Sequence, residues 1–230
     1  MDFLKAKCNT MKYILMIFFV CFIYSCEQKQ QATQSILQDT VKPVSPTPVI
    51  IDEDLITDTS IGKISRSTTL ANLENIFGKS NIQDTINYGA EGMDSFMVTK
   101  IYSNTPKELI IHWQKNKFHS SISRIDLYQE NAAYHTIDSL KIGSTLEMLL
   151  KANGKKINFS GTSWDYGGFI SSYNGGKHNK SNINFRLASA EDASEKIMGD
   201  HELNTDMPLV KDNIKKIYIS NISLILDKNR

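Results

Sequence analysis

The chain is short of cysteine, and the three cysteines that it has lie at its start. Among 230 residues, cysteine occurs only as Cys8, Cys21 and Cys26. The chain after Cys26 therefore cannot form a disulfide within itself, and it offers no thiolate to zinc or to nucleophilic catalysis.

A charge excess of either sign is also lacking. The chain has 26 basic and 25 acidic residues, and without residues 1–25, which hold three lysines and one aspartate, 23 and 24 remain. A balanced charge supplies no basic field for nucleic acid. We therefore expect no nucleic-acid partner.

Long hydrophobic runs are missing as well. The run Ile14–Tyr24, "ILMIFFVCFIY", has eleven residues, which in a helix span about 16 Å, roughly half of a bilayer core. A spanning helix is therefore not expected. Basic residues precede the run, at Lys5, Lys7 and Lys12, and this order is typical of a secretory signal peptide. Either Met1 or Met11 can be its start.

The end of the run and the two residues after it indicate how this signal is processed. The order Ile23, Tyr24, Ser25, Cys26 resembles the bacterial lipobox, in which the cysteine receives a lipid and becomes the first residue after cleavage. The alternatives are an ordinary cleaved signal with a coincidental cysteine, or a packed hydrophobic helix. A single remaining thiol at the new N-terminus favours lipidation of Cys26. We expect residues 1–25 to be removed and the protein to be anchored in a bacterial cell envelope, at the outer membrane.

A tether and two folded parts are expected after the anchor. Residues 26–50 are rich in Gln, Thr and Ser and contain Pro43, Pro46 and Pro48, so they favour a flexible linker. We divide the remainder into residues 51–138 and 139–230, because two segments resemble each other at a constant offset.

The repeat consists of "TLANLENIFGK" at 69–79 and "TLEMLLKANGK" at 145–155, which share five of eleven residues at an offset of 76. Both have residues that start short helices. Ser67 or Thr68 can cap the first helix, and Ser144 and Glu147 form a capping box for the second. Gly78 and Gly154 end them. Chance similarity of helix ends is the alternative to duplication.

Alternating apolar runs follow each helix and predict strands. They are "SFMVTKIYS", "ELIIHWQ" and "SISRIDLYQ" in the first part, and "YGGFISSY", "NINFRLA" and "IKKIYISNISLIL" in the second. The predicted fold class is α+β: two tandem units, each a helix and a three-stranded antiparallel meander, form one curved sheet with helices on one face. A further helix is expected over Ala190–Met198.

The predicted order of helix and strands resembles that of known protein modules. A short capped helix ending in "IFGK" before a meander resembles the helix-plus-sheet module of outer-membrane-assembly lipoproteins, and its tandem form is similar to the β-lactamase inhibitor protein fold. The stretch "NGKKINFSGTSWDYGG", residues 153–168, resembles a motif of uncharacterised lipoproteins of Bacteroidota. The resemblance implies binding to other envelope proteins and brings no catalytic residues.

Candidate binding residues gather in "SWDYGGFISSYNGGKH". Flat aromatic faces and hydrogen-bonding groups suit a sugar ring or a partner's side chains; they come from Trp164, Asp165, Tyr166, Tyr173, Asn174 and His178. The structural alternative places Trp164 and Tyr166 on one strand face, packed on the second helix. Trp113, which shares a strand face with Ile111, is either a core residue or an exposed hot spot.

No cofactor, metal or catalytic residue is predicted. The five histidines are scattered and are interpreted as surface residues, and there is no G-x-S-x-G elbow. The acids Asp52, Glu53 and Asp54 end the tether and do not resemble an acid and base pair. The leading hypothesis is a lipid-anchored, non-enzymatic module that binds an envelope protein. A glycan-binding or glycan-processing lipoprotein is the alternative, and a hydrolase stays open.

Overall fold

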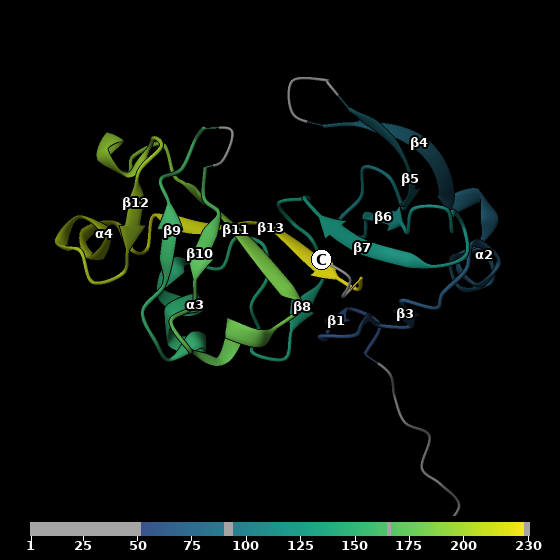
Figure 1. Ribbon diagram of the computed structural model, residues 1–230, viewed down its shortest axis with the longest axis horizontal. Helices are drawn as coiled ribbons and strands as arrows, with labels where there is room; N and C mark the ends of the chain where they lie inside the picture. Colours follow the sequence, from purple (N-terminus) through teal and green to yellow (C-terminus); the bar gives the residue numbers. More distant parts are fainter. Residues whose placement is uncertain (1–51, 90–93, 165–166, 228–230) are drawn as a thin grey trace, which may run out of the picture. The chain divides into compact units, whose positions relative to one another are not determined.

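The computed structural model describes residues 52–89, 94–164 and 167–227 (Figure 1). The predicted signal peptide and tether, with Ser25 and Cys26, lie outside the described residues, as do Asp165 and Tyr166. Within the described ranges, no helix combines the length and the apolar character that crossing a membrane requires.

The fold belongs to the α+β class, as predicted. The described α-helices are short, and they are α2 (Leu70–Phe77), α3 (Leu146–Asn153) and α4 (Pro208–Asn213). Among the described residues, three short 3₁₀ helices accompany them: η1 (Lys79–Asn81), η3 (Lys177–Lys180) and η4 (Glu195–Ile197). The described strands form three sheets.

The main sheet has six strands in the order β11-β13-β7-β6-β5-β4, with every neighbouring pair antiparallel (Figure 1). Its strands are β4 (Ile82–Tyr88), β5 (Ser95–Ile101), β6 (Leu109–Trp113), β7 (Ile122–Leu127), β11 (Ile183–Ser189) and β13 (Ile217–Ile225). Because β13 pairs with β7, both predicted parts of the chain contribute to one sheet.

Two smaller sheets complete the fold. One has the order β3-β2-β1-β8, in which β1 and β8 are parallel, and its strands are β1 (Leu55–Ile56), β2 (Ser60–Ile61), β3 (Ile64–Ser65) and β8 (His135–Thr136). The other has the order β10-β9-β12, with β9 (Asn158–Ser160), β10 (Ile170–Ser172) and β12 (Glu202–Asn204).

Helices α2 and α3 confirm the predicted pair. Each has eight residues, and their threonine caps, Thr69 and Thr145, keep the offset of 76. The Thr69 hydroxyl accepts from the backbone N–H of Asn72, and the Asn72 side chain accepts from the backbone N–H of Thr69. Gly154 closes α3 in the left-handed conformation that glycine favours.

The caps lie one residue later than predicted. The Thr68 hydroxyl instead accepts from the backbone N–H of Ser65, and the Ser144 hydroxyl accepts from that of Lys141. Both side chains therefore close the turn before the helix, and the following threonine is left to cap it. Gly78 ends α2 as predicted, with a positive φ and an extended ψ of 135°.

The meander prediction is right for three strands of the first part and incomplete beyond them. β5, β6 and β7 form an antiparallel meander, to which the unpredicted β4 adds a fourth strand. In the second part, β11 and β13 pair as predicted, but β10 pairs with β9 in a separate sheet. The second part is therefore not a three-stranded meander.

The predicted helix over Ala190–Met198 is wrong, because only the short 3₁₀ helix η4 forms there. The backbone carbonyl of Ile197 accepts from the N–H of Thr162, and the N–H of Ser194 donates to the Asn213 side chain. These bonds to other segments replace the bonds of a helix. Helix α4, which the sequence reading missed, begins with Pro208 in its first turn.

The two faces of the main sheet differ in chemistry. On one face the register places Ile183, Leu224, Ile125 and Ile111 side by side on neighbouring strands, and all four are buried in the hydrophobic core. Because side chains alternate between faces, the residues between them form the second, polar face.

Candidate functional site

The polar face of the main sheet brings together residues that lie far apart in the sequence. One row across β11, β13 and β7 contains Asn184, Ser223 and Asp126. The rows beside it pair Arg186 with Asn221, and Arg124 with His112. We call the side chains on this side of the sheet the polar face.

Asp126 is the centre of the polar face, and its side chain is only 1% exposed. Its Oδ2 lies 2.7 Å from Nε2 of His112 and 3.0 Å from Nε of Arg124. The hydroxyl of Ser223 donates to Oδ1 at 2.6 Å, and that of Tyr128 donates to Oδ2 at 3.3 Å. Each carboxylate oxygen thus accepts from one hydroxyl, and His112 and Arg124 lie at ion-pair distance from Oδ2, so the buried charge is compensated.

These contacts set the ionisation of the cluster. Burial by itself acts to raise the pKa of Asp126, but the hydrogen bond and charge of His112, with help from Arg124 and Ser223, hold that pKa below its usual value. Burial and the negative charge of Asp126 raise the pKa of Tyr128 to about 12. At neutral pH the cluster therefore contains an aspartate anion and a protonated tyrosine.

The cluster contains serine, histidine and aspartate, yet its geometry differs from that of a hydrolase triad. In a triad the serine hydroxyl bonds to the histidine, which then takes its proton. Here Ser223 and His112 both bond to Asp126. The arrangement favours holding Arg124 and His112 in place over activating a nucleophile.

Two depressions open beside Asp126 and share Arg124 and Ile225 in their linings. The first, of about 250 Å³, is named here the Arg186 depression. Its lining includes Arg124, Tyr128, Phe169, Tyr173, Arg186 and Asn221. The second, of about 290 Å³, extends over Phe96 and His112 toward Asp227.

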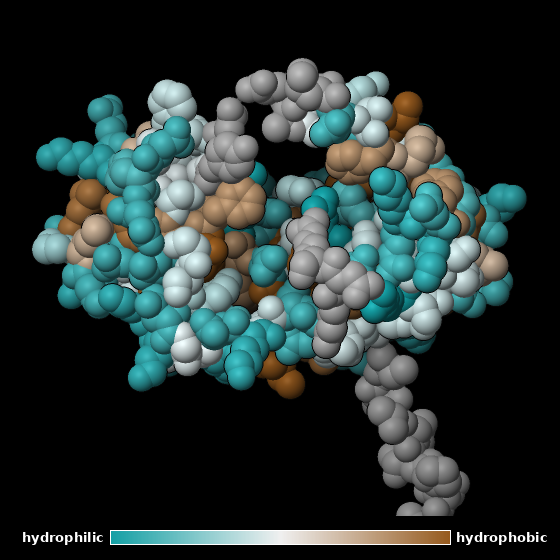
Figure 2. Space-filling model, in the orientation of Figure 1, coloured by the Kyte–Doolittle hydropathy of each residue, from teal (hydrophilic) through white to brown (hydrophobic). Residues whose placement is uncertain are grey.

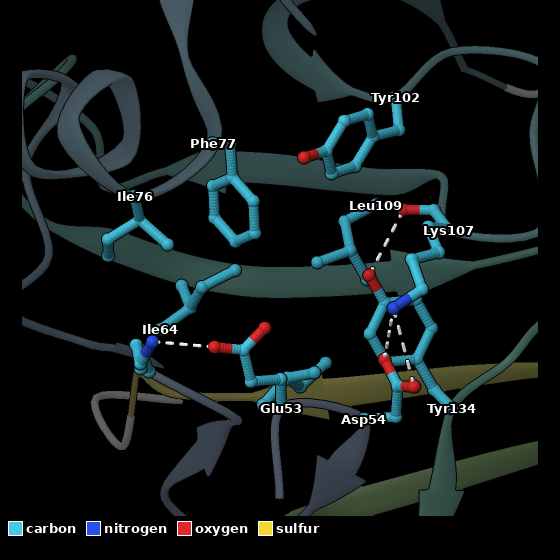
Figure 3. A pocket seen from close by; sticks show the side chains of 11 residues that line it. Glu53, Asp54, Ile64, Ile76, Phe77, Tyr102, Lys107, Leu109 and Tyr134 are labelled. Atoms are coloured by element: carbon cyan, nitrogen blue, oxygen red, sulfur yellow. Dashed lines mark hydrogen bonds and ion pairs between the residues drawn. The ribbon is translucent and has the colours of Figure 1, made fainter. Parts of the chain in front are cut away.

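A third and smaller cavity, of about 90 Å³, lies where the described residues begin. Figure 3 shows Ile76, Phe77 and Tyr102 on one side of it and Glu53 and Asp54 on the other. This volume is well below the roughly 300–1,000 Å³ of usual ligand sites. The cavity has room for a few waters or one side chain.

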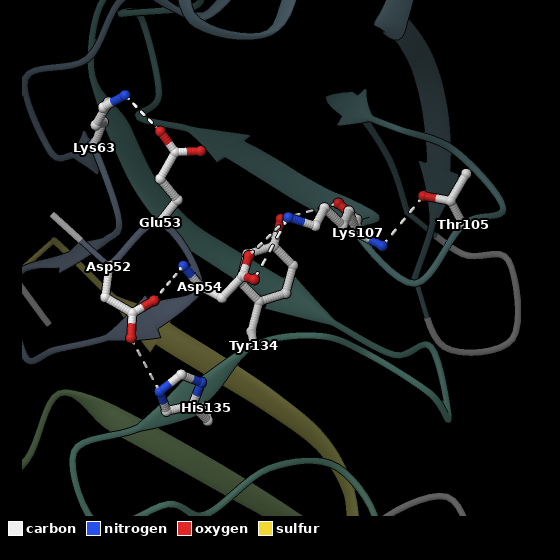
Figure 4. Close-up of polar contacts among 8 residues, drawn as sticks. All are labelled: Asp52, Glu53, Asp54, Lys63, Thr105, Lys107, Tyr134 and His135. Carbon is white, nitrogen blue, oxygen red and sulfur yellow. Dashed lines mark hydrogen bonds and ion pairs between the residues drawn. The ribbon is translucent and has the colours of Figure 1, made fainter. Parts of the chain in front are cut away.

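The three acids at the start of the described residues form ion pairs, as Figure 4 shows. Glu53 lies 2.6 Å from Lys63, Asp54 lies 3.2 Å from Lys107, and Asp52 lies 3.3 Å from His135. The hydrogen bond from Lys63 lowers the pKa of Glu53. Each acid of this group thus faces a cation or a histidine and not a second acid.

Tyr173, Asn174 and His178, three of the predicted binding residues, lie close together. The rings of Tyr173 and His178 are 5.8 Å apart, and the His178 ring also meets Phe185 edge-on. Burial raises the pKa of Tyr173 and lowers that of His178. The Asn174 side chain donates to the backbone carbonyl of Lys156 and to Asn158. Of the three, Tyr173 lines the Arg186 depression.

The two tryptophans have opposite environments. Trp164 lies in a bend outside any strand and is 63% exposed, so the predicted packing on the second helix is wrong for this residue. Trp113 packs in the hydrophobic core, and its indole N–H donates to Thr99 at 2.8 Å. Of the two alternatives for Trp113, the core position is therefore confirmed.

Sequence reading missed the polar face. The alternation in "SISRIDLYQ" separates Arg124 and Asp126 from the apolar positions, and this signal marks the strand's second face. The interpretation of all histidines as surface residues is wrong for His112 and His178, which are buried. Within the described ranges, no three metal-ligating side chains converge.

The chain is thus an α+β protein with a six-stranded antiparallel sheet, one face of which is polar and indented. No protein-family model matches it, and no curated protein does. Among solved structures, it is similar to the uncharacterized protein yfeY from Escherichia coli. The TM-score is 0.41 at 16% sequence identity, over 74% of this chain and 98% of that one.

Proposed function

We propose that this protein is a lipid-anchored module of the bacterial cell envelope that binds an extended segment of another envelope protein along β4. The observation that carries the proposal is the open edge of the main sheet at β4, where large apolar side chains are exposed. The predicted lipidation of Cys26 and the tether over residues 26–50 supply the location.

The edge of β4 is open among the described residues, because β4 pairs only with β5. At the opposite edge, a bridge between Phe169 and Arg186 covers part of β11. An unpaired strand edge offers a row of backbone donors and acceptors to another chain. The exposed edge therefore distinguishes β4 from the other strands of the main sheet.

β4 also lacks the usual protection of edge strands. Natural edges are guarded by lysine, proline or bulges. In "IQDTINY" the one charged residue is Asp84, and it is paired with His119 at 2.9 Å. The strand thus contains no lysine and no proline, and its one charge is paired with a neighbouring histidine.

The side chains next to the edge are suited to an apolar partner. Ile86 is 52% exposed, Tyr88 is 66% exposed, and Met97, opposite Ile86 on β5, is 46% exposed. Figure 2 shows hydrophobic side chains at the surface over β4 and β5. In strand addition, backbone bonds supply affinity and alternate side chains supply specificity. We expect a partner segment with apolar residues at every second position.

The anchor supports this role. A domain tethered to the membrane meets membrane partners at a raised effective concentration, so a modest affinity suffices. The resemblance to Bacteroidota lipoproteins, to assembly-lipoprotein modules and to the β-lactamase inhibitor protein fold, drawn from the sequence, also favours binding to envelope proteins.

The test compares native protein from solubilised envelopes with two lysine variants. Ile86→Lys puts a charge on the β4 edge, and Ile137→Lys is the matched control, because Ile137 is 77% exposed and belongs to no strand of the main sheet. Wild type and Ile137→Lys should recover the same partner, and Ile86→Lys should lose it. Equal recovery by all three proteins would exclude the β4 edge.

The anchor is tested on the same material. Intact mass spectrometry should give a chain that begins at Cys26 and carries acyl groups, and Cys26→Ser should lack them. A soluble, unmodified wild-type chain would remove the envelope part of the proposal.

A second candidate function is glycan binding, favoured by one observation. Tyr173 and Phe169, with Tyr128, give aromatic faces to the Arg186 depression, and aromatic faces are suited to sugar rings. This differs from the predicted cluster, because Trp164 is not among the lining residues and Asp165 and Tyr166 lie outside the described residues.

A further inference from the structure

We propose that, when the envelope partner is absent, two copies of this protein pair through β4, antiparallel about a two-fold axis at Thr85. The axis places Thr85 opposite Thr85 of the second copy, and all seven residues of β4 take part. The displacement of the second copy by an envelope partner rests on the function proposed above, whereas the pairing itself does not.

The backbone of β4 has the correct phase for this pairing. At the end of the β4–β5 ladder, the N–H of Gly89 donates to the carbonyl of Asp94 at 2.8 Å. Bonded and non-bonded pairs alternate along an antiparallel ladder, so the odd-numbered residues of β4 make the bonds to β5. The even-numbered residues between Ile82 and Tyr88 therefore direct their N–H and C=O groups to the outer edge of the sheet (Figure 1). An axis at Thr85 pairs even-numbered residues with even-numbered residues, as a bonded ladder requires.

The side chains that the axis brings together are complementary. Tyr88 faces Ile82 of the second copy, and an aromatic side chain opposite a β-branched one stabilises antiparallel strands. Tyr88 is 66% exposed and Ile82 packs against the hydrophobic core, so this contact extends the core across the axis. Thr85 faces Thr85 of the second copy, and Gln83 faces Asn87. Hydroxyls and amides each supply both donors and acceptors to such pairs.

The charges of the two copies are compatible with the pairing. Asp84 is the one charged residue of β4, and the axis places it opposite Ile86 of the second copy and not opposite Asp84. It keeps its ion pair with His119 and the hydrogen bond from Thr99. Residues 26–230 have 23 basic and 24 acidic side chains, and a net charge near zero leaves little repulsion between copies.

The pairing is small, and a small interface is reversible. A stable interface uses roughly 20–30 residues from each partner, whereas this one is built on a single seven-residue strand from each copy. The predicted anchor raises the effective concentration of the copies at one membrane. We therefore expect a reversible dimer that covers the open edge of β4 and gives way to a partner segment with a better side-chain fit.

Cysteine crosslinking tests the axis, because the chain after Cys26 contains no cysteine of its own. Full-length Thr85→Cys in detergent is oxidised and analysed by non-reducing electrophoresis. Residues at position 85 of the two copies form a non-bonded pair with Cα atoms about 4.5 Å apart, which a disulfide can span. A covalent dimer should therefore form. Ile137→Cys, at an exposed position outside the main sheet, should give only the small amount of product that random collision produces.

Two further variants test the register and do not depend on Thr85→Cys. Gln83 of one copy is offset by four residues from Gln83 of the other, about 13 Å along the strands, and the same holds for Asn87. Gln83→Cys alone and Asn87→Cys alone should therefore stay monomeric, whereas a mixture of the two proteins should crosslink. Product no greater at position 85 and in the mixture than at Ile137→Cys overturns the proposal. Equal product at all four positions does so as well.

The same variant separates this proposal from the proposed function. Reduced Thr85→Cys should recover the envelope partner from solubilised envelopes, and the oxidised, covalently paired form should not. Equal recovery by the two forms contradicts the competition between the second copy and the partner. If wild type recovers no partner, the proposed function fails, while the crosslinking at position 85 still decides whether β4 pairs with itself.

Discussion

Nε2 of His112 and Oδ2 of Asp126 lie 2.7 Å apart on neighbouring strands, and both side chains are buried. This contact joins β6 to β7 on the polar face, and Ser223 extends it to β13. A strand from each predicted half of the chain is thus held to the same carboxylate.

We expect Asp126→Asn to destabilise the protein by about 3 kcal/mol or more, because it removes the buried charge that pairs with Arg124. Urea unfolding followed by circular dichroism measures this loss. Asp192→Asn is the control, since Asp192 forms an exposed pair with Lys216, and its unfolding midpoint should equal that of wild type. If the unfolding midpoints of Asp126→Asn and Asp192→Asn are equal, the charge of Asp126 does not contribute to stability.

His178 should make stability depend on pH between 5 and 7. Burial lowers its pKa in the folded protein, whereas an unfolded chain takes up the proton near pH 6.5. The unfolded state therefore binds more protons in this window, and stability falls as the pH drops below about 6.5.

Thermal unfolding of three proteins measures this dependence. The wild-type melting temperature should fall from pH 7 to pH 5.5, and His178→Gln should remove most of that slope. His201→Gln, at an exposed histidine, should keep the wild-type slope. A slope that is the same in all three proteins would assign the pH dependence to other groups.

The two tryptophans should respond differently to truncation. Trp113→Ala empties a core position and loses the bond to Thr99, so we expect a loss of about 3–5 kcal/mol. Trp164→Ala changes an exposed side chain and should cost less than about 0.5 kcal/mol. Chemical denaturation measures both. A large effect at Trp164 would contradict its exposed position.

Gly168 holds the chain against β11, and a substitution should show this. Its φ is +74°, and a Cβ there would fall on the backbone carbonyl of Leu187, whereas Gly175 has a similar φ of +72° and open space. Gly175→Ala should cost about 1 kcal/mol, from backbone strain alone. Gly168→Ala should cost clearly more, because β11 must move. Equal losses of stability in the two variants would contradict a tight contact between Gly168 and the backbone of Leu187.

Local signals predicted the helices well. The threonine, the apolar stripe and the glycine that define α2 and α3 lie within eleven residues, so the sequence contains nearly all the information needed. The same is true of β5, β6 and β7, where alternation shows both the strand and its two faces.

The candidate sites depend on contacts that no local pattern contains. Asp126 and Ser223 are 97 residues apart and meet because β7 and β13 pair in one particular register. The error over Ala190–Met198 has the same origin, since Ile197 is buried and its carbonyl bonds to Thr162. Tertiary contacts decided the outcome in both places.

Photo-crosslinking along β4 in intact cells tests the central claim most directly. A photoreactive residue is placed at Ile86, at Tyr88 or, as control, at Ile137, and the crosslinked peptides are mapped by mass spectrometry. Strand addition predicts that positions 86 and 88 capture one partner segment at sites about two residues apart, with no product at 137. Capture at 137 equal to that at 86, or no product at either β4 position, would contradict the account.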